Sequence, residues 1–378
     1  MKIGFDAKRA FLNNTGLGNY SRLVIDSLSK YKPENNYRLY TPRIKDNPRL
    51  STILFRNNVQ TCLPKTSFSR NFSSLWRVSN LIVNDLKSDK IDLFHGLSNE
   101  LPISISNSGI PSIVTIHDLI FLRYPEYYHL IDRTIYNYKF LKACENSSKI
   151  IAVSECTKRD IVDFYGINEE KIEVVYQGCS EIFRSNINEL QINQVKSEFS
   201  LPERYILYVG TIESRKNLLL AVKALNIIDP SVNLIVVGRK TKYTDTVIEY
   251  INLNNLQSRV RFLENLNFNV LPVLYKLALA SVYPSRFEGF GIPILESITC
   301  GTPAIGCTGS CLEEAGGKGG LYVDPDDEIA LAEAINSVIE EGALRTQLIE
   351  EGARHAEKFT YHAIADNLFT VYKKTLNL

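Results

Sequence analysis

The chain has 378 residues, more than one ordinary hydrophobic core accommodates, so two domains are expected. Its 43 lysine and arginine residues balance 42 aspartate and glutamate residues, and a formal charge of +1 argues against a protein that binds nucleic acid. The seven cysteines are scattered, the first residues lack an apolar signal core, and no apolar run reaches the length of a membrane span. We therefore expect a cytoplasmic globular protein.

Short apolar strands alternate with helical patterns in the first half of the chain. Between Tyr20 and Tyr31, apolar residues recur at intervals of three and four, which predicts an amphipathic helix. The predicted strands of this half are KIGFDA (2–7), YRLYTP (37–42), DLFHGL (92–97), SIVTIHDL (112–119), KIIAVSE (149–155) and KIEVVY (171–176).

A polar segment at 180–204 interrupts this alternation and is typical of a linker. The pattern then restarts, with predicted helices at 216–228 and 327–342 and a last helix at 361–378. The predicted strands of this half are RYILYVG (204–210), NLIVVG (233–238), RVRFLEN (259–265), ASVYPS (280–285), TPAIGC (302–307) and GGLYVDP (319–325).

Two successive blocks of this kind predict an α/β protein with two doubly wound, Rossmann-like domains, each built on a mainly parallel sheet. We place the N-terminal domain at 1–182 and the C-terminal domain at 183–361. Open sheets bind ligands at the carboxyl ends of their strands. Two such domains facing each other across a cleft would hold one ligand between them.

The stretch RFEGFGIPILE (286–296) forms a turn that leads from a predicted strand into a predicted helix. Pro293 is preorganised for the first helical turn. Gly289 and Gly291 allow the backbone to approach a ligand closely, and the amides at a helix start favour an anion. The loop is therefore suited to a phosphate.

Two glutamates flank this loop, Glu288 before the amides and Glu296 on the first turn of the helix. A carboxylate among these amides would compete with a phosphate unless each glutamate faces something else, such as sugar hydroxyls. The alternative is a capped helix whose glutamates only complement the helix dipole.

The stretch YVGTIESRKNL (208–218) runs from a strand through Gly210 and presents Arg215 and Lys216 at the start of a helix. Two cations at a helix N-terminus are unfavourable with the helix dipole, and a bound diphosphate would relieve that repulsion. The alternative is a solvated basic turn. The amide-rich loop in the same domain favours the diphosphate.

Two further stretches belong to the first half. NNTGLGNY (13–20) places Gly16 and Gly18 in the first loop between a strand and a helix, but Ser21 replaces the third glycine of a dinucleotide fingerprint, which disfavours a nicotinamide dehydrogenase. TIHDLIF places His117 at a strand end, where a ligand cleft would lie. A purely structural histidine is the alternative.

Together these stretches resemble a retaining glycosyltransferase of the GT-B fold, glycosyltransferase family 4. EGFGIPILE is similar to the family's E-x7-E signature, with Glu288 and Glu296 as its glutamates. GTIESRKN resembles its Arg–Lys diphosphate site, TGLGNY its N-terminal glycine loop, and VSECTKRDI (153–161) the segment that closes its first domain. HDLIFLRYP resembles the family's mannosyltransferase-like members. The resemblance spans nearly the whole chain and implies that the terminal helix, 362–378, packs back on the N-terminal domain.

The resemblance implies transfer of a sugar, mannose or a related hexose, from a GDP- or UDP-linked donor to a hydroxyl of a glycan or lipid-linked glycan. Such members serve surface polysaccharide or glycoconjugate biosynthesis, with retention of configuration and without a metal or other cofactor. Basic and aromatic residues in 67–88 add the expectation of peripheral association with the inner face of the cell membrane. The alternative for this segment is an amphipathic helix packed on the sheet.

The resemblance also implies roles for single residues. Arg215, Lys216 and the Gly289–Ile292 amides would stabilise the leaving diphosphate. Glu288 would accept hydrogen bonds from donor-sugar hydroxyls, Glu296 from the ribose diol, and His117 would contact the sugar from the opposite domain. The full donor-binding set is Gly16, Gly18, Gly210, Gly238, Gly289, Phe290, Gly291, Ile292 and Glu296.

Other chemistries remain open. DPDD (324–327) contains an Asp-x-Asp that could hold a divalent metal, but it precedes a predicted helix and is typical of a turn with a helix N-cap. A nucleotide-sugar epimerase or a sugar phosphorylase could share the architecture. A non-catalytic nucleotide-sugar-binding protein could retain the fold.

Overall fold

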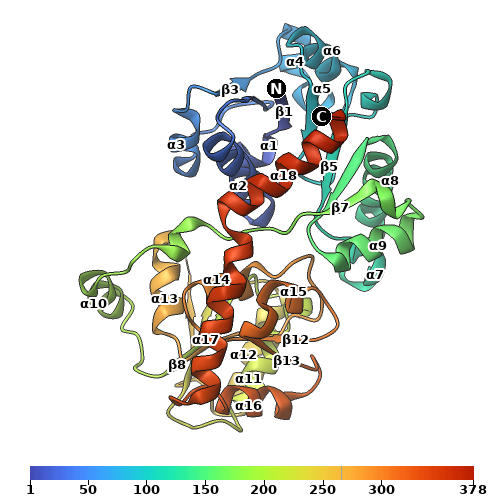
Figure 1. The fold of residues 1–378 in the computed structure, drawn as a ribbon. Helices are drawn as coiled ribbons and strands as arrows, with labels where there is room; N and C mark the ends of the chain where they lie inside the picture. Colours follow the sequence, from blue (N-terminus) through green and yellow to red (C-terminus); the bar gives the residue numbers. More distant parts are fainter. Residues whose placement is uncertain (265) are drawn as a thin grey trace. The chain divides into compact units, whose positions relative to one another are not determined.

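The computed structural model describes residues 1–264 and 266–378, which form two compact units. Unit 1 comprises Met1–Gly178 and Thr360–Leu378, and unit 2 comprises Cys179–Phe359 (Figure 1). These divisions lie within a few residues of the predicted boundaries at 182/183 and 361/362.

Unit 1 is built on a parallel sheet with the strand order β3-β2-β1-β4-β5-β6-β7. The strand SIVTI is buried along its whole length, and KIIA is buried after its first residue, as expected where helices cover both faces of a parallel sheet. Its strands are β1 (Lys2–Asp6), β2 (Asn36–Tyr40), β3 (Val59–Cys62), β4 (Leu93–Gly96), β5 (Ser112–Ile116), β6 (Lys149–Ala152) and β7 (Ile172–Val174).

The predicted amphipathic helix of unit 1 is α2 (Gly16–Tyr31), whose Tyr20, Leu23, Val24 and Leu28 are buried. The terminal helix α18 (Tyr361–Leu376) lies beside it (Figure 1), and Lys32 Nζ lies 2.6 Å from Asp366 Oδ1. The other α-helices are α1 (Lys8–Leu12), α3 (Ser51–Leu54), α4 (Ser67–Asn71), α5 (Ser73–Val78), α6 (Asn80–Ser88), α7 (Ile120–Arg123), α8 (Leu130–Asn146) and α9 (Glu155–Tyr165).

Unit 2 repeats the architecture with a parallel sheet of order β10-β9-β8-β11-β12-β13. Its strands are β8 (Tyr205–Val209), β9 (Asn233–Val237), β10 (Val260–Leu263), β11 (Ala280–Tyr283), β12 (Ala304–Cys307) and β13 (Gly320–Val323). Its α-helices are α10 (Glu189–Glu198), α11 (Leu218–Ala224), α12 (Tyr243–Leu253), α13 (Leu271–Leu277), α14 (Ile292–Thr299), α15 (Leu312–Gly316), α16 (Glu328–Asn336) and α17 (Ala343–Ala356). Two doubly wound, Rossmann-like units confirm the predicted fold class.

Two local differences from the prediction have plain causes. The edge strand β3 was not predicted, because its sequence, VQTC, is half exposed and lacks an apolar run. The predicted linker 180–204 contains the helix α10, which begins with a capping box between Asn188 and Gln191. The predicted strand 259–265 is β10, and its last residue, Asn265, lies outside the described residues.

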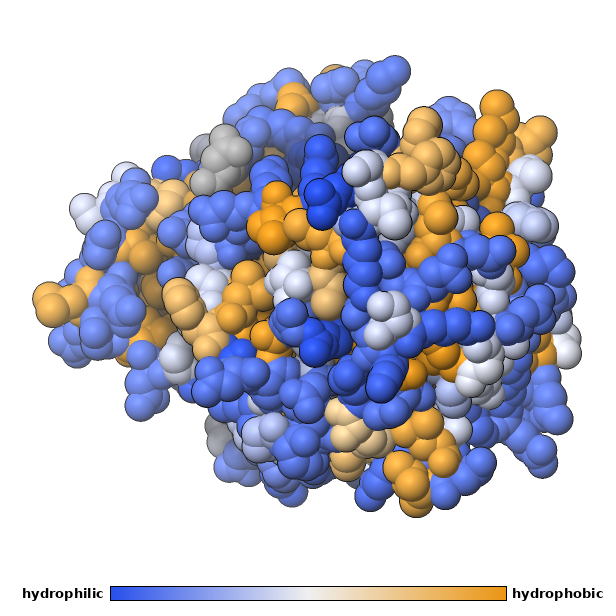
Figure 2. Space-filling view, turned by 90° about the horizontal axis from the view of Figure 1, so that it is seen from above, coloured by the Kyte–Doolittle hydropathy of each residue, from blue (hydrophilic) through white to orange (hydrophobic). Residues whose placement is uncertain are grey.

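The surface seen in Figure 2 is largely hydrophilic, with apolar side chains in separate groups. Throughout the described part of the chain, no helix combines the length and the apolar character needed to cross a bilayer.

Candidate active site

In unit 2 the strand order reverses between β8 and β11, which are hydrogen-bonded neighbours. Ligands of open parallel sheets bind outside the carboxyl ends of the strands at such a reversal. β8 leads through Gly210 to a 3-10 turn at Ser214–Lys216, and β11 leads through residues 284–291 to α14. The sheet therefore brings the two stretches singled out in the sequence to one edge. Arg215 and Lys216 stand in the 3-10 turn, just before α11 rather than in it.

Glycines at this edge are required by close backbone packing. A Cβ on Gly238 would lie 1.8 Å from the carbonyl oxygen of Gly210, whose own amide donates to Val237 O at 2.9 Å. Gly291 has a φ of 109°, and a Cβ there would lie 2.6 Å from Leu312 Cδ2. Gly210, Gly238 and Gly291 thus set the shape of the loops.

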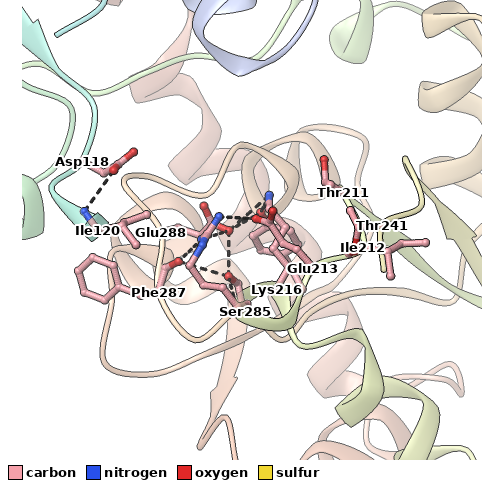
Figure 3. Close-up of polar contacts among 12 residues, drawn as sticks. Asp118, Ile120, Thr211, Ile212, Glu213, Lys216, Thr241, Ser285, Phe287 and Glu288 are labelled. Atoms are coloured by element: carbon pink, nitrogen blue, oxygen red, sulfur yellow. Dashed lines mark hydrogen bonds and ion pairs between the residues drawn. The ribbon is translucent and has the colours of Figure 1, made fainter. Parts of the chain in front are cut away.

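The Glu288 carboxylate is held through one of its two oxygens, Oε1 (Figure 3). Four side chains place donors around Oε1: Tyr283 OH at 2.8 Å, Ser285 Oγ at 2.8 Å, Arg215 Nη1 at 2.9 Å and Lys216 Nζ at 3.4 Å. No described residue donates a hydrogen bond to the other oxygen, Oε2. The carboxylate is thus fixed in place while Oε2 can accept a hydrogen bond from a ligand.

The charge state of Glu288 follows from its neighbours. Burial alone would raise its pKa, but the charges of Lys216 and Arg215, with the hydrogen bonds from Tyr283 and Ser285, lower the pKa of Glu288 to about 2. Glu288 is therefore ionised at neutral pH. It serves as an acceptor and as the counter-charge of two cations.

The cations have further partners. Arg215 Nη2 lies 2.7 Å from Glu213 Oε1, and Nη1 also donates to the carbonyl oxygen of Phe287. Lys216 Nζ donates to Tyr283 OH at 2.8 Å. Because the two cations face two carboxylates, the formal charge of the cluster is zero without a ligand.

The loop before α14 presents backbone and not the Phe290 side chain. Pro293 stands in the first turn of α14, as predicted. The amides of Gly291 and Ile292 donate no hydrogen bond to any described residue. The Phe290 side chain is buried, with its ring 5.6 Å from that of Phe359. Only the backbone of Phe290 is therefore placed to contact a donor.

Glu296 differs from Glu288 in its charge state, although each accepts a hydrogen bond from a tyrosine hydroxyl. It is the fifth residue of α14, so it belongs to the second helical turn and not to the first, as the sequence suggested. Its side chain is buried, and Tyr275 OH donates to Oε2 at 3.0 Å. Burial raises the pKa of Glu296 to about 8, a rise that this hydrogen bond only partly opposes. The group is therefore mostly a neutral acid at pH 7.

In unit 1, His117 directly follows β5 and is buried. Its Nε2 lies 3.0 Å from the carbonyl oxygen of Leu97, its Nδ1 lies 3.2 Å from Gln177 Nε2, and its backbone amide donates to Asn99 Oδ1 at 2.8 Å. Since a carbonyl can only accept, Nε2 carries the hydrogen and Nδ1 accepts from Gln177. Burial lowers the pKa of His117 to about 4, so the imidazole is neutral. A contact between the ring and a sugar would require the exchange of one of these partners.

In the predicted glycine loop of unit 1, backbone packing requires a glycine at only one of the two positions. A Cβ on Gly18 would lie 1.9 Å from the carbonyl oxygen of Asn13, so the loop cannot form with a side chain there. Gly16 is the first residue of α2, and a Cβ there would meet nothing within 4 Å. Gly18 is therefore explained by packing, and a close backbone approach to a ligand stays a prediction for Gly16.

Each aspartate of DPDD has a local role. Asp324 Oδ1 accepts from the amide of Asp326, whose own carboxylate lies 2.6 Å from Arg286 Nη2. Asp327 caps α16 by accepting from the amides of Ile329 and Ala330. The predicted N-cap is confirmed.

Sequence reasoning missed Tyr283, Ser285 and Gln177. Tyr283 and Ser285 end the predicted strand ASVYPS, directly before the loop that drew attention, and a polar pair at a strand end was the available signal. Gln177 lies far along the chain from His117, and no local pattern links the two residues.

Comparison with known proteins shows two family models that together match most of the chain. The model described as Glycosyltransferase Family 4 matches residues 24–181, and the one described as Glycosyl transferases group 1 matches residues 191–355. The chain is 28% identical over 296 residues to O-antigen chain mannosyltransferase B of Escherichia coli, covering 76% of each protein. It is 31% identical over 225 residues to O-antigen chain mannosyltransferase RfbU of Salmonella typhimurium, covering 60% of each.

Solved structures share the fold over almost the entire chain. HepE of Anabaena in complex with UDP and glucose has a TM-score of 0.76 at 19% identity, with 99% of this chain and 100% of that chain covered. A glycosyltransferase from Rickettsia africae has a TM-score of 0.77 at 19% identity, with 99% of this chain and 98% of that chain covered.

Proposed function

Because this chain belongs to glycosyltransferase family 4 and has the GT-B fold, we propose that it transfers a hexose from a nucleoside-diphosphate donor to an acceptor hydroxyl, with retention of configuration. Mannose is the first candidate for the hexose, because curated relatives are named as mannosyltransferases. Their O-antigen role supports a glycan or lipid-linked glycan acceptor in surface polysaccharide synthesis. The donor is linked to GDP or UDP.

One observation carries this proposal. Glu288 is ionised and held at Oε1 by Arg215 and Lys216, while Oε2 accepts nothing from the described residues. A single rigid group therefore offers an acceptor for a sugar hydroxyl next to two cations suited to a diphosphate. A helix-cap role for Glu288 would need neither cation.

This geometry supports the following chemistry. The acceptor oxygen attacks the anomeric carbon, the bond between that carbon and the diphosphate oxygen breaks, and its electron pair stays on the diphosphate. The acceptor's proton moves to a leaving phosphate oxygen. Arg215, Lys216 and the Gly291 and Ile292 amides stabilise the charge that grows there, because they are preorganised at that edge of the sheet. Oε2 of Glu288 holds a sugar hydroxyl as the anomeric carbon becomes cationic.

Two residues support binding of the donor. The Glu296 carboxyl hydrogen-bonds to the ribose diol of the nucleotide. The neutral imidazole of His117 contacts the donor sugar after exchanging its hydrogen bond with Gln177 for one with a sugar hydroxyl.

The test is a screen of GDP-mannose, GDP-fucose, UDP-glucose and UDP-galactose with alkyl glycosides as acceptors. We expect release of nucleoside diphosphate from one of these donors and a product whose anomeric configuration, read by NMR, matches that of the donor. Isomerisation of the donor sugar without an acceptor would indicate an epimerase, and dependence on orthophosphate would indicate a phosphorylase. Binding without turnover would indicate a non-catalytic protein.

We also propose that the enzyme acts in the cytoplasm at an anionic membrane surface, through α4 and α5. Phe68, Phe72 and Leu75 are 51–55% exposed, whereas Trp76 is buried and its indole donates to Asp85 Oδ2 at 2.8 Å. Part of the segment 67–88 thus packs on the sheet, as the alternative held, and part presents apolar side chains to solvent. Flotation with anionic liposomes at low salt should carry the protein upward, and a Phe68→Ser/Phe72→Ser/Leu75→Ser variant should stay behind.

A further inference from the structure

Unit 1 has its own reversal of strand order, and the glycine stretch NNTGLGNY (13–20) lies in the connection that follows its first strand. The reversal lies between β1 and β4, whose last paired residues are Asp6 and Gly96. A ligand of an open parallel sheet is expected outside these strand ends. The residues that directly follow β1 are Ala7, Lys8 and Arg9.

Lys8 and Arg9 are half-buried cations. Neither side chain forms a hydrogen bond or an ion pair with any described residue. A cation with long rotatable bonds is normally found in solvent or with a partner, since partial burial costs hydration. These two side chains have given up part of their hydration without a partner of their own.

The carboxylates nearby are already committed to other cations. Asp6 Oδ2 lies 2.6 Å from Arg77 Nη1, and Asp6 Oδ1 accepts from the backbone amide of Lys8 at 3.2 Å. Glu100 pairs with Arg77 Nη2 and, at 3.1 Å, with Lys139 Nζ. Four cations thus face two carboxylates, which leaves a formal charge of +2 at the strand ends.

The excess cations also act on one another. Burial lowers the pKa of Lys8 first, and the charges of Arg77 and Arg9 lower it further, while Asp6 and Glu100 oppose the shift. The charge of Arg9 also contributes to the lowered pKa of His117, after burial. Lys8 and Arg9 follow β1, and His117 follows β5, at the same edge of the sheet, and a bound anion would relieve the repulsion between the cations.

We propose that Lys8 and Arg9 bind an anionic group of the acceptor, a phosphate or a carboxylate. This proposal rests on the transferase function proposed above and names the class of acceptor that unit 1 takes. Arg9 offers a planar fork that matches two oxygens of either group, and Lys8 adds a compact charge from the neighbouring position. The acceptor hydroxyl itself is neutral, so the anion lies elsewhere on the acceptor molecule, such as a phosphate that links a glycan to its carrier or a uronate within the glycan.

Direct binding tests this inference without any sugar transfer. In an Arg215→Ala/Lys216→Ala background, which removes the diphosphate site of unit 2, isothermal titration with methyl phosphate and with acetate measures the anion site of unit 1. We expect binding of at least one of the two anions, weakened about tenfold by Lys8→Gln and by Arg9→Gln, as the loss of one charge-assisted contact implies. The matched control is Lys45→Gln, which removes an exposed lysine of unit 1 and should leave binding unchanged.

Kinetics then connects the site to the acceptor. Two acceptors with the same terminal sugar, an alkyl glycoside and the corresponding glycosyl phosphate, are compared with an alkyl uronide. We expect a lower KM for one charged acceptor, and Lys8→Gln and Arg9→Gln should remove that preference while the KM for the neutral glycoside stays the same. If the variants raise the KM of the glycosyl phosphate, the site binds a phosphate. If they raise the KM of the alkyl uronide, the site binds a carboxylate.

The outcomes separate the inference from the function on which it rests. Absence of anion binding in the Arg215→Ala/Lys216→Ala background, or binding that neither Lys8→Gln nor Arg9→Gln weakens, would overturn the inference while leaving sugar transfer intact. Anion binding that depends on Lys8 and Arg9 in a protein that transfers no sugar would instead overturn the proposed function and retain the site. Thermal unfolding of each variant checks that a lost signal is not lost folding.

Discussion

The two units carry the same arrangement of charged residues at the same place in their sheets, and they differ in how the charges are paired. In each unit the strand order reverses between the first strand and the fourth, which are β1 and β4 in unit 1 and β8 and β11 in unit 2. Two cations follow the first of these strands, and a glutamate follows the fourth. In unit 1 the cations are Lys8 and Arg9 and the glutamate is Glu100. In unit 2 the cations are Arg215 and Lys216 and the glutamate is Glu288.

In unit 2 the glutamate pairs with both cations, whereas in unit 1 Glu100 is occupied by Arg77 and Lys139. The topology of the sheet fixes where the charges stand. A cation from elsewhere in the chain, Arg77 on α5, decides whether they are neutralised. The same sheet edge therefore gives a neutral, rigid cluster in one unit and a positive region in the other, which suits the two units to different ligands.

The largest effect is expected from the paired cations of unit 2. Arg215→Ala and Lys216→Ala should each lower turnover about 100-fold, because each removes a charge-assisted contact of about 3 kcal/mol to the leaving diphosphate. Steady-state kinetics with saturating donor measures this loss. Lys223→Ala is the control, since Lys223 pairs with Glu328 at 2.9 Å on the exposed side of α11. Turnover within twofold of the parent in both cation variants would rule out the diphosphate assignment.

Removal of the counter-charge should have the next largest effect. Glu288→Gln keeps the shape of the side chain but weakens its hydrogen bond to the sugar as the anomeric carbon becomes cationic. Turnover should fall about tenfold more than donor affinity weakens. The matched control is Glu213→Gln, because Glu213 also pairs with Arg215 but is 39% exposed, and its loss should change turnover less than twofold. Equal losses in the two variants would show that Glu288 acts only by holding Arg215.

The contacts on which these two predictions depend could be predicted from the sequence only in part. Each local stretch, from the turn before Pro293 to the Arg215–Lys216 pair, could be predicted, because glycine, proline and helix-start chemistry act over a few residues. The pairing of Glu288 with Arg215 could not, since it depends on β8 and β11 being neighbours, and strand order is a property of the whole sheet. Which aromatic side chain of 67–88 is buried could not be predicted for the same reason: Trp76 is buried, but local periodicity does not identify the residues that pack against it.

A smaller effect is expected for Glu296, whose burial could not be predicted from the sequence motif. The pKa of Glu296 is raised from 4.5 to about 8 by burial, so the folded state holds the proton that the unfolded chain has lost. The free energy of unfolding of the parent should therefore fall, relative to Glu296→Gln, as the pH rises from about 4.5 to about 8. Within that window the difference grows by at most about 1.4 kcal/mol per pH unit.

Urea denaturation at pH 5, 6, 7 and 8 measures this difference, with Glu249→Gln as an exposed control on α12. Because Glu296 is mostly neutral at pH 7, Glu296→Gln should raise the donor KM there by only about threefold, with a smaller loss in turnover. A constant difference in stability from pH 5 to pH 8 would contradict the raised pKa. Matching kinetic profiles for Glu288→Gln and Glu296→Gln would contradict the division of labour between the two glutamates.

The smallest expected effect is that of metal removal, and the pairing in unit 2 makes it informative. Since Glu213 and Glu288 cancel the formal charge of Arg215 and Lys216, a diphosphate gains no net attraction from these four groups and must compete with the carboxylates for the cations. A divalent metal bound to the diphosphate would be one solution. The other is that Arg215 and Lys216 turn to the diphosphate while Tyr283 and Ser285 keep Oε1 of Glu288 in place and its Oε2 accepts from the sugar, with the Gly291 and Ile292 amides adding donors. We expect the second, so activity after gel filtration into EDTA should stay within about twofold of that with added magnesium or manganese.

Recovery of activity only with a divalent metal would mean that the carboxylates keep their cations when the donor binds. The neutral cluster of unit 2 would then hold Glu288 in place without neutralising the diphosphate.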